Sequence, residues 1–199
     1  MYDETIGLAT GKVGEFELSL FRQMKDRIKI LQSPRSMSPA RVWEYVIETG
    51  RFVNLPTEGV QALLNLVKSI DIPTDHIFEK IWVVESDHSS VDPNVLPFIP
   101  HFDRKRTTKI MLYLTDVSHC DGPMYIATNR RPHDYEVSRR QVVAKGENLV
   151  TDADVVYEPL LGPAGHFHIF DTNLPHFAGA PTQDGSRSVI RFDFVHVRQ

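Results

Sequence analysis

Residues 107–117 read TTKIMLYLTDV, and the alternation within this stretch decides the fold. In an extended strand, side chains two positions apart share a face. One face is therefore aliphatic, with Ile110, Leu112 and Leu114. The other face is mixed and carries Lys109, Met111, Tyr113 and Thr115. Residues 186–197 alternate in the same way, with Ser188, Ile190, Phe192 and Phe194 opposite Arg187, Val189, Arg191 and Asp193.

Two arrangements fit strands of this kind. In the simpler one, the aliphatic face packs inward and the polar face meets solvent. In the other, the aliphatic face is the outside of a barrel and packs on helices, while the interior holds a polar cavity. The N-terminal third favours the second arrangement, because three amphipathic helices predicted there need an apolar surface to cover.

These helices are predicted from apolar spacing and from end signals. They span residues 14–32, 38–50 and 57–70. In the second, Ser38 and Pro39 read as the N-cap and first helical position, and Gly50 reads as the stop. The first third of the chain is therefore expected to be mostly helical.

Beyond about residue 75, the pattern changes to short β-rich runs separated by Pro, Gly, Asn and Asp. The predicted strands are residues 77–85, 107–117, 123–127, 155–161, 165–171 and 186–197. Strands at this spacing are typical of a β-sandwich or barrel rather than of alternating βαβ units. The chain contains no internal repeat and no linker. It is predicted to be one domain, with a helical part at 1–75 that packs on a β core at 76–199.

Composition excludes several classes of function. The chain has 199 residues and a formal charge of −4, which does not favour nucleic acid as a partner. No apolar run approaches the roughly 20 residues that span a bilayer, and the N-terminus lacks the pattern of a secretory signal. The only cysteine is Cys120, so no intrachain disulfide can form and no activating partner makes it a nucleophile. We expect a compact cytoplasmic protein whose nine histidines are the first candidates for chemistry.

A metal-ligand pattern begins at His101-Phe102-Asp103. On an extended segment, the imidazole and the carboxylate of this pattern point to the same side. The best third ligand is His176, which follows the predicted strand 165–171. Two histidines and one carboxylate on one face of an ion leave three positions open, which suits non-haem Fe(II).

Other histidines have structural interpretations. A second H-x-D match, His119-Cys120-Asp121, precedes Gly122-Pro123 and is interpreted as a turn between strands. His166 and His168 flank Phe167 on a strand and are interpreted as barrel-facing polar residues rather than ligands.

An anion site accompanies the metal pattern. Arg187 lies on the mixed face of the last strand, and a guanidinium is a bidentate partner for a carboxylate at any working pH. Tyr113 lies on the mixed face of its own strand and offers a phenol to the same carboxylate. The chain therefore contains, in order, H-x-D, an inward tyrosine, a distant histidine and an arginine.

With these elements in this order, the sequence resembles the Fe(II)/2-oxoglutarate-dependent dioxygenases, and within them the phytanoyl-CoA dioxygenase-like branch. The resemblance covers residues 97–197. The stretches that carry it are His101-Phe102-Asp103, residues 111–116 and 121–124, Arg131-Pro132-His133-Asp134-Tyr135, and His176 through Arg187.

The resemblance implies a double-stranded β-helix (jelly-roll, cupin-like) core with flanking helices. It implies that His101, Asp103 and His176 hold Fe(II), and that Arg187 and Tyr113 bind the distal carboxylate of 2-oxoglutarate. It further implies consumption of molecular oxygen, release of succinate and CO2, and hydroxylation of a small-molecule substrate. One departure is Ala178, which stands where relatives often carry a hydroxyl residue.

Substrate contacts are predicted from position. Arg191 shares the face of Arg187, and Trp82 and Glu85 are further candidates on a neighbouring strand. Arg104-Lys105-Arg106 is either a solvated loop or a basic cluster that attracts an anionic substrate to the site.

Two other functions remain compatible with these residues. One is a cupin-like isomerase or hydrolase that uses another metal without 2-oxoglutarate. The other is a jelly-roll binding module in which the histidines are structural. No pattern in the sequence identifies the substrate or an oligomeric state, and CoA esters, amino acids, nucleosides and natural-product intermediates all remain compatible.

Overall fold

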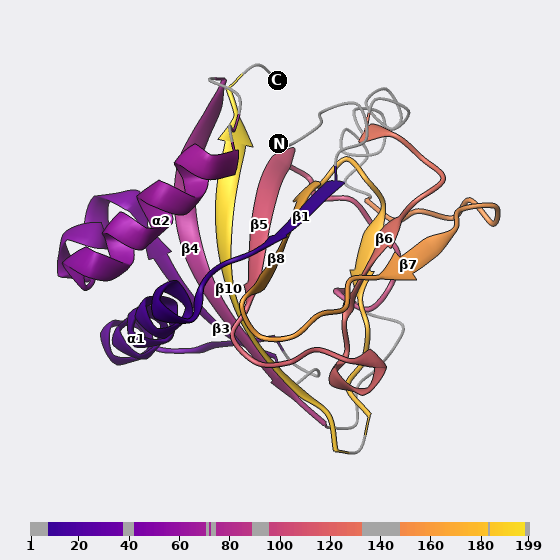
Figure 1. Ribbon diagram of the computed structural model, residues 1–199. Coiled ribbons are helices and arrows are strands. Elements are labelled where there is room, and N and C mark those ends of the chain that lie inside the picture. Colours follow the sequence, from indigo (N-terminus) through magenta and orange to yellow (C-terminus); the bar gives the residue numbers. More distant parts are fainter. Residues whose placement is uncertain are drawn as a thin grey trace.

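The computed structural model describes residues 8–37, 42–70, 72, 75–88, 96–132, 148–182 and 184–197. Its main feature is a 7-stranded sheet, in which every neighbouring pair of strands is antiparallel (Figure 1). The strands, in spatial order, are β1 (Leu8–Lys12), β8 (His166–Asp171), β5 (Thr107–Tyr113), β10 (Ser186–His196), β4 (His76–Asp87), β3 (Val42–Glu48) and β2 (Arg35–Met37).

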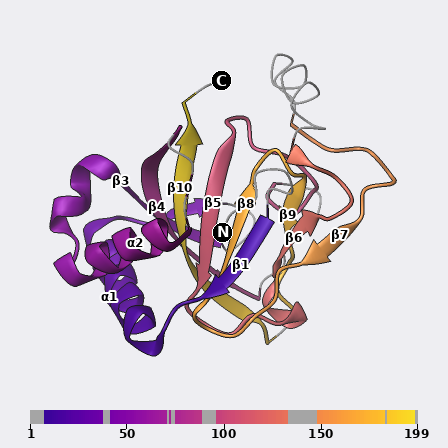
Figure 2. The ribbon, with the colours of Figure 1, turned by 45° about the horizontal axis from the view of Figure 1, so that its top comes forward.

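A smaller sheet of three strands lies across from the larger one (Figure 2). It contains β7 (Tyr157–Pro159), β6 (Met124–Ala127) and β9 (His176–Ala178). A cluster of buried side chains from both sheets and their loops fills part of the space between them, including Met111, Ile126, Phe170, Leu174 and Val189. Each predicted strand overlaps one of these strands, so the mainly β architecture is confirmed.

Two helices cover the outer face of the larger sheet, on the side away from the smaller sheet (Figures 1 and 2). They are α1 (Glu15–Leu31) and α2 (Thr57–Ile70), which confirm two of the three predicted helices. Their apolar stripes join the main core, where the Phe21 ring of α1 lies 5.7 Å from the Phe192 ring of β10. Among the described residues, no helix has the length and apolar character needed to cross a membrane.

The predicted helix at residues 38–50 is wrong. Residues 38–41 lie outside the described part of the chain, but Val42–Glu48 is strand β3, followed by the short 3-10 helix η1 (Thr49–Asn54). The segment is rich in β-branched and aromatic residues, and a short apolar run of this kind fits either period. Pairing with β2 and β4 on either side decides in favour of the strand.

The two faces of β5 and β10 confirm the barrel arrangement with a polar interior. Ile110 and Leu112 of β5 belong to the core beneath the helices, as do Ile190 and Phe192 of β10. The mixed faces look toward the smaller sheet. A register shift between Asp193 and Phe194 interrupts the pairing of β10 with β4, and the alternation of β10 up to Asp193 matches the prediction.

The turn predicted at the second H-x-D match is confirmed. His119–Asp121 forms the 3-10 helix η2, capped by Ser118, and Gly122 follows with a φ of 69°. A Cβ at Gly122 would stand 2.5 Å from the carbonyl oxygen of Gly179, so both the φ and the space require glycine here.

Candidate metal centre

The backbone brings His101 and His176 directly opposite each other. The amide of His101 donates to the carbonyl of His176 at 3.0 Å, and the amide of His176 donates to the carbonyl of His101 at 2.8 Å. Such an exchange of hydrogen bonds defines a paired position between antiparallel segments and sets both Cβ atoms on the same side. The two imidazole centroids lie 4.6 Å apart.

Both imidazoles are fixed in the same tautomer by main-chain carbonyls. Nδ1 of His101 donates to the carbonyl of Ile99 at 2.7 Å, and Nδ1 of His176 donates to that of Leu174 at 2.8 Å. A carbonyl oxygen only accepts, so Nδ1 carries the proton in each ring and Nε2 keeps its lone pair. Metal-ligating histidines are commonly oriented by such bonds at the other ring nitrogen.

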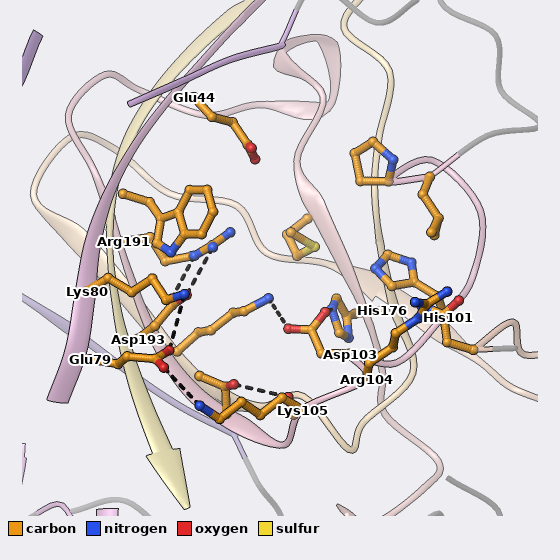
Figure 3. Close-up of a pocket in the computed structure, with 17 residues that line it drawn as sticks. Glu44, Glu79, Lys80, His101, Asp103, Arg104, Lys105, His176, Arg191 and Asp193 are labelled. Atoms are coloured by element: carbon orange, nitrogen blue, oxygen red, sulfur yellow. Dashed lines mark hydrogen bonds and ion pairs between the residues drawn. The ribbon is translucent and has the colours of Figure 1, made fainter. Parts of the chain in front are cut away.

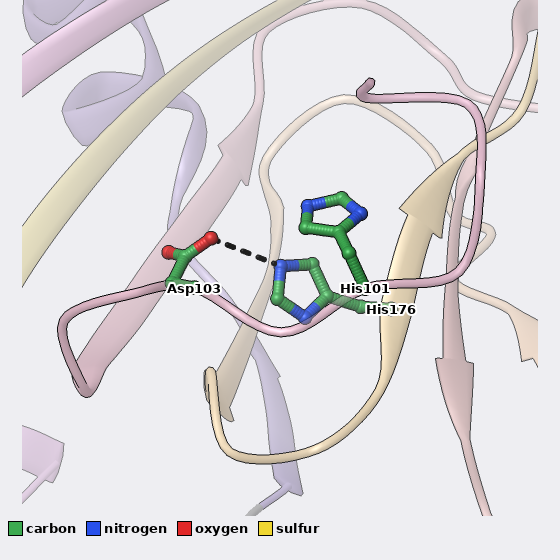
Figure 4. Close-up of side chains that lie close together, drawn as sticks. All are labelled: His101, Asp103 and His176. Carbon is green, nitrogen blue, oxygen red and sulfur yellow. Dashed lines mark ion pairs between the residues drawn. The ribbon is translucent and has the colours of Figure 1, made fainter. Parts of the chain in front are cut away.

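Asp103 completes a group of three ligand atoms that all lie within 4.8 Å of one another (Figure 4). Its Oδ1 lies 3.5 Å from Nε2 of His176. That contact is long for a hydrogen bond, and within the described part of the chain the buried Nε2 of His176 has no hydrogen-bond partner. An orphaned imidazole nitrogen facing a carboxylate fits a divalent cation, because the ion would satisfy both.

The electrostatics favour the ligand forms of these side chains. Burial, reinforced by the neighbouring His176, lowers the pKa of His101 to about 4, so this imidazole is neutral near pH 7. Burial acts to raise the pKa of Asp103, but the Lys109 ammonium and the contact with His176 hold it well below its ordinary value. A neutral imidazole and an ionised carboxylate are the states that bind metal.

Arg187 is a buried cation with unused donors. Arg187 is 6% exposed, and its Nε and Nη1 have no hydrogen-bond partner among the described residues. Burial lowers the pKa of Arg187, against the opposing effects of Tyr113 and Asp121. An arginine guanidinium nevertheless stays charged in proteins, so this one is suited to an anionic ligand that would supply the missing acceptors.

Tyr113 lies near Arg187, but its proton is already used. The phenol donates to the carbonyl of Leu160 at 2.5 Å, and burial raises the pKa of Tyr113. The geometry therefore does not support the predicted role of Tyr113 as a second donor to the carboxylate that Arg187 would bind. Tyr113 instead shapes the interior, where its ring lies 5.2 Å from the His168 ring.

A cavity of about 420 Å³ adjoins the His101–Asp103–His176 group. Figure 3 shows Arg191 and Asp193 on one side of it and the two histidines on the other. Its charged lining residues are nearly balanced in sign: Glu44, Glu79, Asp103 and Asp193 against Lys80, Arg104, Lys105, Lys109 and Arg191. Such a wall offers many hydrogen-bonding groups to a bound molecule.

Arg191 and Trp82 both line this cavity, as predicted, and they contact each other. The Arg191 guanidinium lies 4.7 Å from the centroid of the Trp82 ring and donates to both carboxylate oxygens of Asp193, at 2.8 and 3.1 Å. The buried Nε1 of Trp82 has no hydrogen-bond partner among the residues that the structure describes. The stack and the ion pair hold the guanidinium in place.

Glu85 does not face the cavity, contrary to the prediction. Its carboxylate pairs with Lys29 and Lys25 of α1, on the helix-covered side of the sheet. Glu85 lies three positions after Trp82 on β4, and an odd offset along a strand places two side chains on opposite faces.

The basic cluster after the H-x-D motif divides in the structure. Arg104 and Lys105 line the cavity, and Lys105 pairs with Glu79 at 2.8 Å. Arg106 instead donates from Nε and Nη2 to Asp171, at 2.9 and 2.6 Å. Arg106 therefore ties the loop to β8 and does not line the cavity.

The remaining sequence candidates lie elsewhere. His168 is buried and outside the group of three ligand atoms, and burial, with His166 nearby, lowers its pKa to about 4. His166 lies two positions earlier on β8 and is likewise outside that group. Of the motif at residues 131–135, His133, Asp134 and Tyr135 lie outside the described residues.

Lys109 and Glu44 are among the cavity residues that sequence reasoning missed. Lys109 was placed on the correct face of its strand, but nothing in the pattern indicated its contact with Asp103. Glu44 was not predicted because residues 38–50 were expected to form a helix. With β3 as a strand, Glu44 alternates with Tyr45 and points to the cavity side, as Figure 3 shows.

Solved structures share this architecture over nearly the whole chain. The 2-oxoglutarate-dependent carbocyclase SnoK matches with a TM-score of 0.68 and 16% identity, over 98% of this chain and 81% of its own. HygX from Streptomyces hygroscopicus, with nickel and 2-oxoglutarate bound, matches with 0.65 and 15%, over 99% and 85%. EvdO2 from Micromonospora carbonacea var. aurantiaca, complexed with 2-oxoglutarate, matches with 0.61 and 18%, over 96% and 87%.

The fold is the jelly roll of these enzymes. This confirms the predicted fold class, a mainly β chain with flanking helices around a double-stranded β-helix core. By sequence, no protein-family model and no curated protein matches the chain.

Proposed function

We propose that this protein is an Fe(II)- and 2-oxoglutarate-dependent oxygenase that acts on a polar small molecule. The observation that carries the proposal is the set of three ligand atoms within 4.8 Å, two imidazole nitrogens and one carboxylate oxygen. These donors suit Fe(II) and cover one face of an ion, which leaves room for a chelating cosubstrate and for oxygen.

Each ligand has a defined task in this proposal. His101 and His176 present Nε2, because main-chain carbonyls hold their Nδ1 protons. Asp103 presents one carboxylate oxygen and supplies the negative charge. A ferrous ion bound there would, with oxygen and 2-oxoglutarate, supply the oxidising chemistry that hydroxylates a substrate and releases succinate and CO2.

Arg187 is the proposed partner for the distal carboxylate of 2-oxoglutarate. Its Nε and Nη1 lack acceptors within the described residues, and leaving charged donors unpaired in a protein interior costs free energy unless a ligand uses them. The buried guanidinium of Arg187 also favours the oxygenase over a cupin-like isomerase or hydrolase, which needs no partner for a 2-oxoglutarate carboxylate.

The substrate is proposed to be polar and to bind against Arg191 and Trp82. Ion pairs line the cavity wall, and Nε1 of Trp82 donates to no other described residue. A long acyl chain would bury apolar surface against these charges, so the wall does not favour a fatty acyl substrate of the phytanoyl type. The sequence left Arg104-Lys105-Arg106 as either a solvated loop or a basic cluster that attracts an anionic substrate, and the position of Arg104 and Lys105 at the cavity supports the second alternative.

Anaerobic reconstitution with Fe(II) and 2-oxoglutarate tests the proposal. The wild-type protein should develop the weak visible charge-transfer band of the metal chelate. The His101→Ala and Arg187→Ala proteins should lack it under the same conditions. Matched controls are His119→Ala, an exposed histidine of η2, and Arg130→Ala, a surface arginine paired with Asp154, and both should keep the band.

Two results would contradict the proposal. A wild-type protein that binds no iron would support the jelly-roll binding module. Iron binding without a band, and without oxygen uptake on addition of 2-oxoglutarate, would support the isomerase or hydrolase.

A further inference from the structure

Lys109 makes a contact that the proposed ligand set does not explain. Its Nζ lies 2.6 Å from Oδ2 of Asp103, and the lysine is 7% exposed. The other carboxylate oxygen, Oδ1, faces Nε2 of His176. The two oxygens of Asp103 therefore face different groups, with the Lys109 ammonium at Oδ2 and the His176 imidazole at Oδ1.

The two residues of this ion pair differ in how firmly the backbone holds them. Lys109 lies within β5, paired with Phe170 of β8 on one side and Asp193 of β10 on the other. Asp103 lies outside the ladders, in the loop after the bridge at His101. The ammonium is therefore set by the sheet, while the carboxylate needs a tether to hold its orientation.

A buried lysine next to a cation site carries an electrostatic cost. Burying the ammonium is unfavourable unless it is paired, and its charge repels a divalent ion a few ångströms away. A methionine would fill the same space without either cost. The lysine must therefore contribute something that outweighs the repulsion.

We propose that Lys109 is a positioning residue for the metal site, a role that rests on the proposed function. It holds Oδ2 of Asp103, so that Oδ1 alone is presented beside Nε2 of His101 and His176. Carboxylate ligands are commonly hydrogen-bonded in this way, and losing such a partner typically weakens metal binding by about 10–100-fold. Lys109 thereby keeps the carboxylate from turning toward the ion with both oxygens, which would occupy a position that the cosubstrate needs.

Mn(II) affinity, measured by titration calorimetry under nitrogen, tests this role. Lys109→Met removes the ammonium with little change in shape and should weaken Mn(II) binding by about 10–100-fold. Lys80→Met is the matched control, since Lys80 lines the same cavity but contacts Glu79 and lies over the Trp82 ring, not on a ligand. It removes the same charge and should leave the affinity within about threefold or tighten it, because repulsion is relieved.

A second readout guards against misfolding. Lys109→Gln retains a hydrogen-bond donor, and its thermal unfolding shows whether the protein is folded. Its anaerobic Fe(II) and 2-oxoglutarate band should be weaker or shifted relative to wild type. Mn(II) binding by Lys109→Met that equals or exceeds wild type would overturn the assignment of Lys109 alone. Absence of Mn(II) binding by the wild type would instead overturn the proposed metal site, and with it this inference.

Discussion

His101 and His176 are hydrogen-bonded to each other through their backbones in both directions, although they come from distant parts of the chain. Separate bonds from each Nδ1 to the carbonyls of Ile99 and Leu174 leave both Nε2 atoms available as ligands. Asp103 follows two positions after His101 and adds its carboxylate to that side. Backbone pairing therefore places the two histidines of the candidate metal centre, while Asp103 lies in the loop that follows His101.

Arg187 is expected to favour ligand binding at the expense of stability. Arg187→Met should leave the ligand-free protein equally stable or more stable, by up to about 4 kcal/mol, since it removes a buried cation whose Nε and Nη1 have no partner among the described residues. The same change should weaken 2-oxoglutarate binding by about 10–100-fold. Urea unfolding and equilibrium titration measure the two effects. A loss of stability together with unchanged 2-oxoglutarate affinity would contradict both expectations, and Arg130→Met serves as the surface control.

Acid should destabilise the protein through its buried histidines. Burial, with His76 adjacent, lowers the pKa of His196 to about 4, while an unfolded histidine titrates near about 6.5. The unfolded chain therefore binds more protons between these pH values, so the free energy of unfolding is highest above about pH 6.5 and falls as the pH drops toward 4.

His196→Gln tests this pH dependence. The amide can keep a hydrogen bond to Oγ1 of Thr108, which lies 3.1 Å from Nε2 of His196. The slope of the unfolding free energy against pH, measured between pH 6.5 and pH 4, gives the number of protons taken up on unfolding. In His196→Gln that number should fall by about one. The matched control is His119→Gln, which replaces an exposed histidine. An identical slope in His196→Gln and wild type would show that His196 does not titrate in this way.

The helix-covered face of the large sheet is expected to carry much of the stability. Phe192 is 0% exposed and packs on Phe21, so Phe192→Ala should cost about 3–5 kcal/mol in chemical unfolding. Phe16 is 71% exposed, and Phe16→Ala should change the free energy of unfolding by less than about 0.5 kcal/mol. Equal effects of the two substitutions would argue against helix α1 packing on β10.

Glu85 is expected to be irrelevant to the metal site. Its carboxylate is partly exposed and pairs with lysines of α1, so Glu85→Gln should lower stability by at most about 1 kcal/mol. The anaerobic charge-transfer band should be unchanged in this variant. By contrast, Asp103→Asn should abolish the band, since the amide is a weak metal ligand without charge. A band lost in Glu85→Gln would place this residue at the site after all.

Sequence patterns predicted the sheet more reliably than the helices. The alternation in residues 107–117 and 186–197 predicted both faces of β5 and β10, because period-two patterns persist wherever a strand separates two environments. The same kind of pattern gave the wrong prediction for residues 42–48, which were expected to be helical but form β3. A run of this length fits a helical stripe or a strand, and only the neighbouring strands β2 and β4 decide which backbone groups it bonds.

The sequence by itself determined which residues could ligate a metal, because His101, Asp103, His176 and Arg187 have side-chain chemistry that does not depend on the fold. Only the tertiary structure decided that Lys109 contacts Asp103, that Tyr113 gives its proton to Leu160, and that Glu85 faces helix α1. Those outcomes depend on pairings between strands and on loop paths that join distant residues. Local periodicity records which face a side chain occupies, but not which neighbour it meets there.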